Sequence, residues 1–434
     1  MKITKLHLKN FRQFEDLEIN FSKTSNIAVF IGENGCGKST VLDAISKMLA
    51  QFIRQQYYME YKNQNSYLNK EDSNLNNTDN IYVELRFSTE NKDLYIKNGD
   101  VYRSGITYDS NIQIDYDKDI FYFITAYRNN ADRMVFQTNN GNFLDSIAEE
   151  NRMNRIENQV ADIYETALNI ILTDITSTRK PFEEWFLQLE NTELQTIFDT
   201  KNFNYRLPEL QIFRNTIKTF YNNLSETNFE QLKGNREKGG KIMDLATQWV
   251  ELKKGNIFLK LNQLSTGEQA MLMLVTDITR RLLLVAPNLE NIEQQSGIVL
   301  IDEIDQHLHP KWQRRILPAL AKTFPNVQFI VTTHSPQVLS GAPNGSVFGL
   351  KDGKVYHENT FGRDNNWILQ VVMDDEERPR EIKEQLETYF GYIRNGQETE
   401  AVALRNELET LLGSDEPEFV KADILMRRKF SPTK

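Results

Sequence analysis

The feature that most constrains this sequence is a glycine-rich segment placed between an apolar run and a helix-like stretch. The apolar run covers residues 27–31, and Gly32, Gly35 and Gly37 follow it before Lys38. A short, wholly apolar run is typical of a buried strand. Glycines let the backbone turn tightly and point several N–H groups into one concavity, which binds anions at a helix N-terminus. The segment therefore predicts a phosphate-binding loop of a nucleotide site.

The residues of this loop have separate expected roles. Lys38 supplies a positive charge for the β- and γ-phosphates, and the Ser39 hydroxyl is placed to bind Mg²⁺. We expect the loop to bind nucleotide through Asn34, Gly35, Cys36, Gly37, Lys38, Ser39 and Thr40. A chance glycine-rich turn would explain neither the strand before the loop nor the helical spacing of apolar residues after it.

A second apolar run, residues 298–301, ends in two acids, Asp302 and Glu303. Ligands of parallel sheets bind at the carboxyl ends of the strands, where Asp302 would lie. A carboxylate at that position holds Mg²⁺ directly or through water. The next acid can orient and polarise an attacking water. The sequence thus predicts hydrolysis of ATP, with Asp302 as a metal ligand and Glu303 as a catalytic residue.

A third segment, Leu264-Ser265-Thr266-Gly267-Glu268-Gln269, lies upstream of these acids. It resembles the signature motif of ABC-type ATPases, with Thr266 where transporters carry glycine. The resemblance implies that two heads enclose ATP between them. Ser265 and Gly267 of one head would then meet the γ-phosphate bound by the other. Ser265 is also a good helix N-cap, and this simpler interpretation explains the serine alone.

Three of the five histidines lie in one block after the acids. His334 follows an apolar strand at residues 328–333 and matches the switch histidine that contacts the γ-phosphate in ABC-type ATPases, so we expect it to be catalytic. Asp305 and the following histidines resemble the loop that faces the opposite head. For His307 and His309 a structural role and a functional role are equally compatible with the sequence, and nothing else in the sequence supports a metal pair at this i, i+2 spacing.

Composition limits the function classes. The 434 residues suffice for two or three domains, and the net charge of −10 argues against a protein coated in nucleic acid. No apolar run is long enough to span a bilayer and no signal peptide is visible, so we expect no membrane association. The single cysteine, Cys36, allows no intrachain disulfide and favours a cytoplasmic location.

Two basic clusters are exceptions to the acidic balance. One comprises Lys233, Arg236, Lys238 and Lys241, which we expect in a glycine-rich loop. The other is Arg427-Arg428-Lys429 near the end of the sequence. A solvated surface is favoured over a phosphate contact for both, because charge runs are usually solvated.

The predicted fold class is α/β: an ABC-type P-loop ATPase head with a mixed sheet and an antiparallel β subdomain, plus a helical insertion and a C-terminal helical hairpin. The expected domains are residues 1–141, the first half of the head, residues 142–228, the helical insertion, residues 229–357, the second half of the head, and residues 358–434, a helical tail.

Period-two alternation from Ile81 to Ile124 predicts the β subdomain. Asn395-Gly396 is expected to break the tail into its hairpin. Gln137 is a weak candidate for the Q-loop glutamine.

A narrower resemblance rests on several segments together. Lys9-Asn10-Phe11-Arg12 and the motifs above look like the heads of SMC/RecF-like ABC ATPases, which implies that Arg12 contacts the nucleotide. Residues 300–313, 332–340 and the tail motif Phe361-Gly362-Arg363-Asp364 resemble the ATPase subunit of Septu-type antiphage systems. In that family the ATPase is paired with a separate HNH endonuclease, and some relatives accompany retron reverse transcriptases.

Two functions compete. The first is an ATPase that self-assembles and regulates an HNH-type nuclease partner, with DNA reached through the complex. The alternative is a RecF-like DNA-repair or recombination ATPase that clamps DNA directly. No strand with the acids of a Toprim nuclease follows Ser340, so a nuclease would be a partner chain. The tail has apolar helical positions that we expect either at an interface or against the head: Ile382, Leu386, Tyr389, Leu404, Leu408 and Leu411.

Overall fold

The computed structural model describes residues 2–22, 24–57, 72–73, 81–88, 93–99, 106–107, 123–127, 175–225, 229–237, 248–285 and 295–430. The chain divides into two compact units, Met1–Ile368 and Leu369–Lys434. Gln137 and the first part of the predicted helical insertion, residues 142–174, lie outside the described residues.

A six-stranded sheet forms the centre of the first unit, in the order β14-β13-β3-β12-β11-β7. Its strands are β3 (Ile27–Ile31), β7 (Phe123–Tyr127), β11 (Gly297–Ile301), β12 (Val327–Thr332), β13 (Val347–Lys351) and β14 (Lys354–Glu358). All neighbours are parallel except the antiparallel pair β13–β14. Every residue of β3, β11 and β12 is buried, as in a parallel sheet covered on both faces. The carboxyl ends of β3 and β11 therefore lie at one edge, with only β12 between them.

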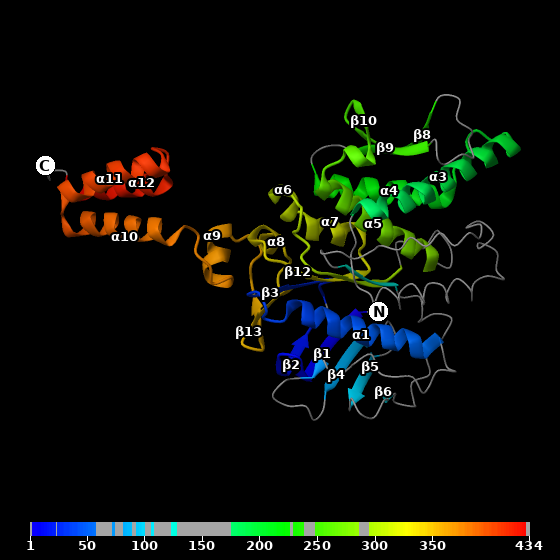
Figure 1. Ribbon diagram of the computed structural model, residues 1–434, viewed down its shortest axis with the longest axis horizontal. Coiled ribbons are helices and arrows are strands. Elements are labelled where there is room, and N and C mark those ends of the chain that lie inside the picture. Colours follow the sequence, from blue (N-terminus) through cyan, green and yellow to red (C-terminus); the bar gives the residue numbers. More distant parts are fainter. Residues whose placement is uncertain are drawn as a thin grey trace. The chain divides into compact units, whose positions relative to one another are not determined.

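A second, antiparallel sheet has the order β2-β1-β4-β5-β6. Its strands are β1 (Lys2–Phe11), β2 (Phe14–Asn20), β4 (Tyr82–Ser88), β5 (Asp93–Gly99) and β6 (Ile106–Thr107). Helix α1 (Lys38–Tyr57) lies between the two sheets, and its apolar residues share one core with both (Figure 1). The predicted α/β head with a mixed sheet and an antiparallel β subdomain is thus confirmed.

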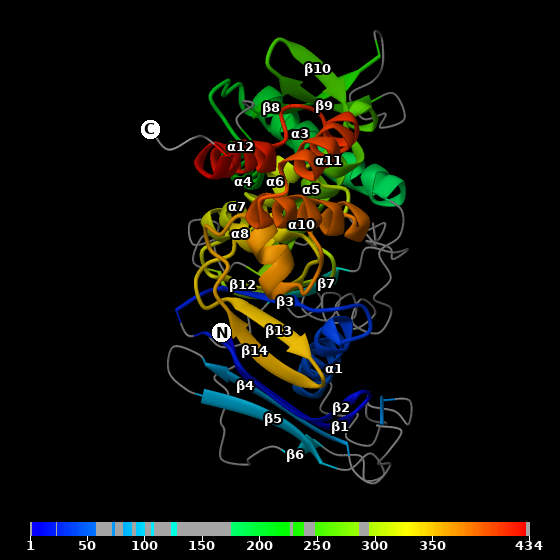
Figure 2. The ribbon, with the colours of Figure 1, turned by 90° about the vertical axis from the view of Figure 1, so that its left-hand side faces the viewer.

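Two long helices, α3 (Ile175–Thr200) and α4 (Pro208–Leu224), pack against a third sheet of order β10-β9-β8. Its strands are β8 (Phe229–Arg236), β9 (Gln248–Lys254) and β10 (Ile257–Lys260). Figure 2 shows this small sheet at the opposite end of the first unit from β4 and β5. In the sequence, this sheet lies between the phosphate loop and β11, the strand that Asp302 and Glu303 follow.

The prediction that Lys233 and Arg236 lie in a glycine-rich loop is wrong, because both belong to β8. Gly234 serves close packing here: a Cβ at this position would lie 2.6 Å from Leu187 Cδ2 of α3. A glycine in a strand can mark such a close approach rather than a turn. Lys238 and Lys241 lie outside the described residues.

The remaining helical segments are short except for one. They are the 3-10 turn η6 (Leu261–Gln263), α5 (Thr266–Val285), α6 (Pro310–Gln313), α7 (Ile316–Thr323), α8 (Pro336–Ser340), α9 (Asn365–Trp367) and the π-helical turn η8 (Ile368–Val372). Helices α3 and α4 both pack on α5. Within the described part of the chain, no helix combines the length and the apolar character needed to cross a bilayer.

The second unit contains three helices, α10 (Arg380–Asn395), α11 (Glu398–Leu412) and α12 (Pro417–Phe430). Gly396 ends α10 in a left-handed conformation with φ 78°, so the break predicted at Asn395–Gly396 is confirmed. Helix α12 follows the predicted hairpin and was missed. It buries little more than Phe419 and Ala422, and so narrow an apolar face gives a weak periodic signal.

The apolar positions of the tail mostly face one another. Five of the six that we expect at an interface or against the head pack in or against the core of this three-helix unit: Ile382, Leu386, Tyr389, Leu404 and Leu408. The expectation that they face a partner is therefore wrong, since their side chains are covered by neighbouring helices. Leu411 is the exception, with 64 % exposure.

Candidate nucleotide and hydrolysis site

The phosphate loop turns tightly between β3 and α1. Gly32 (φ 146°), Gly35 (φ 83°) and Gly37 (φ 106°) have backbone conformations that favour glycine. A Cβ on Gly37 would lie 2.3 Å from Gln13 Nε2, and one on Gly32 would lie 2.5 Å from the carbonyl oxygen of Leu350. The loop therefore depends on glycine both for its turn and for its close contact with neighbouring segments.

Lys38 is folded back onto this loop. Its ammonium donates hydrogen bonds of 2.9 Å to the carbonyl oxygens of Gly32 and Glu33. The lysine is buried and is the first residue of α1, and the first N–H groups of a helix have no acceptor within the helix. The other predicted ligands are exposed Asn34 and Gly35, half-buried Cys36 and buried Thr40. A buried positive charge beside a helix N-terminus is an arrangement that binds phosphate.

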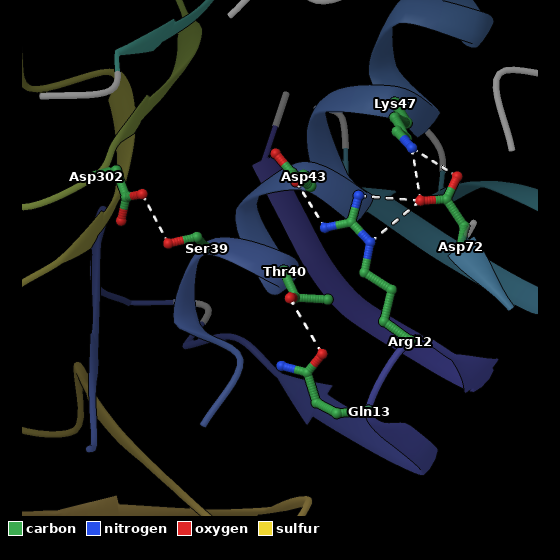
Figure 3. A network of polar contacts seen from close by, with 8 residues as sticks. All are labelled: Arg12, Gln13, Ser39, Thr40, Asp43, Lys47, Asp72 and Asp302. Carbon is green, nitrogen blue, oxygen red and sulfur yellow. Dashed lines mark hydrogen bonds and ion pairs between the residues drawn. The ribbon is translucent and has the colours of Figure 1, made fainter. Parts of the chain in front are cut away.

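Ser39 and Asp302 join the two halves of the site. The Ser39 hydroxyl donates a 2.7 Å hydrogen bond to Oδ2 of Asp302 (Figure 3). At the end of neighbouring β12, the Thr332 hydroxyl donates to the other carboxylate oxygen. The same hydroxyl accepts a 2.7 Å bond from the N–H of Glu303. Adjacent strands thus hold both predicted acids beside the phosphate loop.

A hydroxyl and a carboxylate in contact fit Mg²⁺, which prefers oxygen ligands and usually keeps several waters. Among the described residues, no group of three or more His, Cys, Asp or Glu could hold a metal by itself. Ser39 and Asp302 therefore suit a cation that they share with phosphate. His309 has another function, since its Nδ1 accepts a 3.3 Å bond from the Lys311 N–H and caps α6. This contact supports the structural role for His309.

Glu303 and His334 lie at the carboxyl ends of the adjacent strands β11 and β12. Glu303 has a left-handed backbone (φ 53°), which is uncommon for a residue with a Cβ and marks a constrained position. The N–H of His334 donates a 3.3 Å bond to Asp305 Oδ1, which also accepts from the Thr333 hydroxyl. Both predicted catalytic side chains are half-buried, so solvent and substrate can reach them.

Gln313 ties the loop after the acids to α8. Its Nε2 donates 3.1 Å bonds to the carbonyl oxygens of Asp305 and Leu308. Its Oε1 accepts a 2.9 Å bond from the hydroxyl of Ser335, the residue after His334. One amide side chain therefore links the loop that follows Glu303 to the segment that carries the histidine.

Arg12 lies between two carboxylates (Figure 3). Its guanidinium donates a 2.8 Å bond to Asp43 Oδ2 and bonds of 3.0 and 3.2 Å to Asp72 Oδ1. Lys47 pairs with the same Asp72 carboxylate, which is 1 % exposed. Burial acts to lower the pKa of Arg12, but the bonds and charges of the two aspartates outweigh it and raise the pKa. Here Arg12 braces α1, and its role as a nucleotide ligand stays a prediction.

A capping box positions the signature segment. Ser265 Oγ accepts a 3.3 Å bond from the Glu268 N–H, and Glu268 Oε2 accepts bonds of 3.0 and 2.9 Å from the Ser265 N–H and hydroxyl. Lys254 Nζ lies 2.6 Å from Glu268 Oε1. Burial acts to raise the pKa of Glu268, but the bonds from Lys254 and Ser265 outweigh it and hold the pKa below its usual range. Helix α5 therefore starts at a defined N-terminus whose Ser265 is exposed.

Sequence reasoning missed Gln13, Asp43 and Asp72. The Thr40 hydroxyl donates a 3.3 Å bond to Gln13 Oε1, so this glutamine lies beside the phosphate loop. Gln13 directly follows Arg12, and that adjacency was the available signal. Asp72 lies in a polar stretch without periodicity, and no local pattern marks it as a buried partner of Arg12.

Parts of this sequence are similar to known proteins. Residues 27–340 match the family described as AAA domain, putative AbiEii toxin, Type IV TA system. Over 442 residues the chain is 30 % identical to the retron Ec83 probable ATPase of Escherichia coli, covering 88 % of this chain and 78 % of that protein. Over 392 residues it is 23 % identical to the Septu protein PtuA of Bacillus thuringiensis, covering 86 % and 83 %.

Among solved structures, a match is the SMC head bound to the C-winged helix domain of ScpA. It has 16 % identity and a TM-score of 0.46, and covers 83 % of this chain and 98 % of that chain. The resemblance to Septu-type ATPase subunits is confirmed by the sequence relatives. The chain belongs to this family of AAA-domain proteins and is an ATPase.

Proposed function

We propose that this ATPase binds ATP with Mg²⁺, hydrolyses it between two engaged heads, and regulates a separate HNH-type nuclease in antiphage defence. The observation that carries the chemistry is the 2.7 Å hydrogen bond between Ser39 and Asp302. It places the phosphate loop, the acid pair and the helix N-terminus of α1 at one edge of the sheet, where ligands of parallel sheets bind.

In this proposal each side chain has one task. Lys38 and the N–H groups of the phosphate loop hold the β- and γ-phosphates. Ser39 and Asp302 hold Mg²⁺, which neutralises charge on the phosphates. Glu303 orients and polarises the attacking water, and its backbone bond to Thr332 fixes its direction. His334 contacts the γ-phosphate from the neighbouring strand.

The second head supplies its signature segment to the same phosphate. The exposed Ser265 and the N-terminus of the 20-residue helix α5 support this assignment. The capping box holds the segment in place before the heads engage, so little ordering cost is added at that step. A γ-phosphate between two heads would then bind both copies together, and hydrolysis would release them.

The nuclease partner follows from what the resemblance to Septu-type ATPase subunits implies, and two features of this chain fit it. After His334 the sequence has one histidine, His357, which is too few for an HNH metal site. Helix α12 carries Val420 and Ile424, which are 62 % and 51 % exposed and lie one helical turn apart. Apolar surface rimmed by polar residues can form an interaction site, and we propose this pair as the nuclease contact. DNA is reached through the complex.

A defence assay separates this function from DNA repair. The gene is expressed with its genomic neighbours in a phage-sensitive host, and plaques are counted. We expect fewer plaques on the host that expresses the wild type than on the host without these genes. Lys38→Ala and Glu303→Gln should not reduce the plaque count. Gly391→Ala is the matched control, since a Cβ at that helical position meets no atom within 4 Å. Unchanged plaque counts with rescue of a repair-deficient host would instead support a RecF-like ATPase.

A further inference from the structure

Helices α3 and α4 cover one face of the sheet β8-β9-β10, and among the described residues the other face is open. Leu232, Val250 and Leu252 are buried on the covered face. On that side the Gly234 N–H donates a 2.6 Å bond to the Glu190 carboxylate of α3. Because side chains alternate along a strand, the residues between these point to the opposite side. That side is the open face.

The pairing register shows which side chains share the open face. Lys233 of β8 and Lys260 of β10 both pair with Glu251 of β9. Phe258 pairs with Lys253, two residues further along β9 from Glu251. Directly paired residues project to the same side of a sheet. The open face therefore carries three lysines around one glutamate.

Two of these lysines lie on aromatic rings. The Lys233 ammonium is 3.8 Å from the centroid of the Phe258 ring, and the Lys260 ammonium is 4.0 Å from that of Trp249. Phe258 is 41 % exposed. Glu251, the acid among them, accepts bonds of 2.7 Å from Trp249 Nε1 and 3.0 Å from Asn235 Nδ2. Oε1 of the Glu251 carboxylate is thus engaged by two neutral donors.

We propose that this open face binds single-stranded nucleic acid. Phosphates complement the lysines, and the ring faces of Phe258 and Trp249 that the lysines leave uncovered offer stacking surfaces for bases. Trp249 precedes Lys253, the partner of Phe258, by four positions, so the rings are separated by roughly 13 Å along β9 at the usual strand rise. A duplex keeps its base faces stacked inside and can use only the lysines. The site adds a function to the ATPase and does not depend on the nuclease partner.

Binding is measured by fluorescence anisotropy of a labelled thymidine oligonucleotide with the full-length chain. The double variant Lys233→Ala/Phe258→Ala should bind about tenfold more weakly or worse, because it loses one stacking surface and one phosphate contact. The matched control is Lys354→Ala/Tyr356→Ala on β14, which also removes an exposed lysine and an exposed aromatic ring (Tyr356, 47 %). This control should bind like the wild type. A uridine oligonucleotide and a duplex of equal length are the comparison ligands.

Single variants divide the two contributions. The plot of log affinity against log salt has a negative slope. Lys233→Ala should make this slope less steep by about 0.7, whereas Phe258→Ala should leave it unchanged. Circular dichroism and ATP turnover of each variant confirm that the protein is folded. Equal losses in the test and control variants would overturn the proposal. So would tighter binding of the duplex than of the single strand, or no binding by the wild type.

Discussion

Gly267, at the start of the signature helix, packs directly on the backbone of His307: a Cβ on this glycine would lie 2.4 Å from the His307 carbonyl oxygen. The contact joins the segment that we assign to the partner's γ-phosphate to the loop that follows Glu303. Tyr221 of α4 also holds the signature helix, since its hydroxyl donates a 3.0 Å bond to the Glu268 carbonyl oxygen. Within one head, the signature segment that faces the other head is therefore packed on the loop that follows Glu303.

Gly267→Ala should weaken hydrolysis while sparing nucleotide binding. The added methyl group cannot fit against a backbone oxygen, so the loop or the helix must shift, with a stability loss of about 1–3 kcal/mol. Gly391→Ala, in α10, is the control and should leave turnover unchanged, since no atom lies within 4 Å of its Cβ. ATP turnover and fluorescent-nucleotide binding are compared. Equal turnover of both variants would contradict the proposed coupling.

Lys38→Ala and Glu303→Gln should fail at different steps. Lys38 contacts phosphate in the ground state, so its loss should abolish ATP binding. Glu303 acts on the water, so Glu303→Gln should bind ATP normally and lose about 10²- to 10⁴-fold in turnover. Equilibrium binding and steady-state phosphate release measure the two effects. Wild-type turnover by Glu303→Gln would show that this carboxylate does not act on the attacking water.

Ser265→Arg should bind nucleotide as a monomer but neither assemble with ATP nor hydrolyse it. The arginine places bulk and charge where the other head must approach, and Ser265 is exposed for that approach. Mixing Ser265→Arg with Lys38→Ala should restore part of the turnover, because one site of each mixed pair has an intact loop and an intact signature. Absence of any gain on mixing, or full activity of Ser265→Arg alone, argues against action in trans.

The capping box should make stability depend on acid pH. The pKa of Glu268 is lower in the folded chain, so its contribution is present above the unfolded value, about 4.3, and is lost as pH falls through the folded pKa. Near neutral pH, Glu268→Gln loses the charge that pairs with Lys254 and should reduce the free energy of unfolding by about 1 kcal/mol. Denaturant titrations from neutral to acid pH should find this difference shrinking. A difference that stays constant to the lowest pH would refute the assignment.

Val420→Asp combined with Ile424→Asp should release the nuclease without unfolding α12. Both side chains are more than half exposed, so the new charges cost little in the free chain but are buried at the proposed contact. Affinity for the purified nuclease should fall at least tenfold, a loss typical of central interface positions. Phe203→Asp, which alters a side chain 79 % exposed in the first unit, is the control. Equal affinity of both variants would place the contact elsewhere.

The phosphate loop and the acid pair were predictable because their signals are local. Wholly apolar runs identify β3 and β11, and Asp302 is marked by its place directly after the second run. Parallel strands bring their carboxyl ends to one edge, so the meeting of Ser39 and Asp302 follows from the fold class alone.

Contacts that join distant segments without a periodic pattern were not predictable. Asp72 is identified as a buried ion-pair partner only once Arg12 and Lys47 are placed in space. Gly234 looks like a turn residue in sequence, yet its missing side chain permits close packing of a strand on α3. Leu386 and Tyr389 are buried in a core that includes residues of α12. Their burial was not predictable, because the apolar face of α12 is too narrow for this helix to be recognised in the sequence.

The position of β3 has a consequence for biosynthesis. This strand, the one that carries the phosphate loop, pairs on one side with β12 and on the other with β13. The ribosome makes both partner strands about 300 residues later. During translation β3 therefore stays without these partners for roughly 15 to 60 seconds at usual elongation rates. An apolar strand exposed for that time is a target for chaperones and for aggregation. A nascent chain therefore acquires its nucleotide site only when the head is nearly complete, and a truncated product has none.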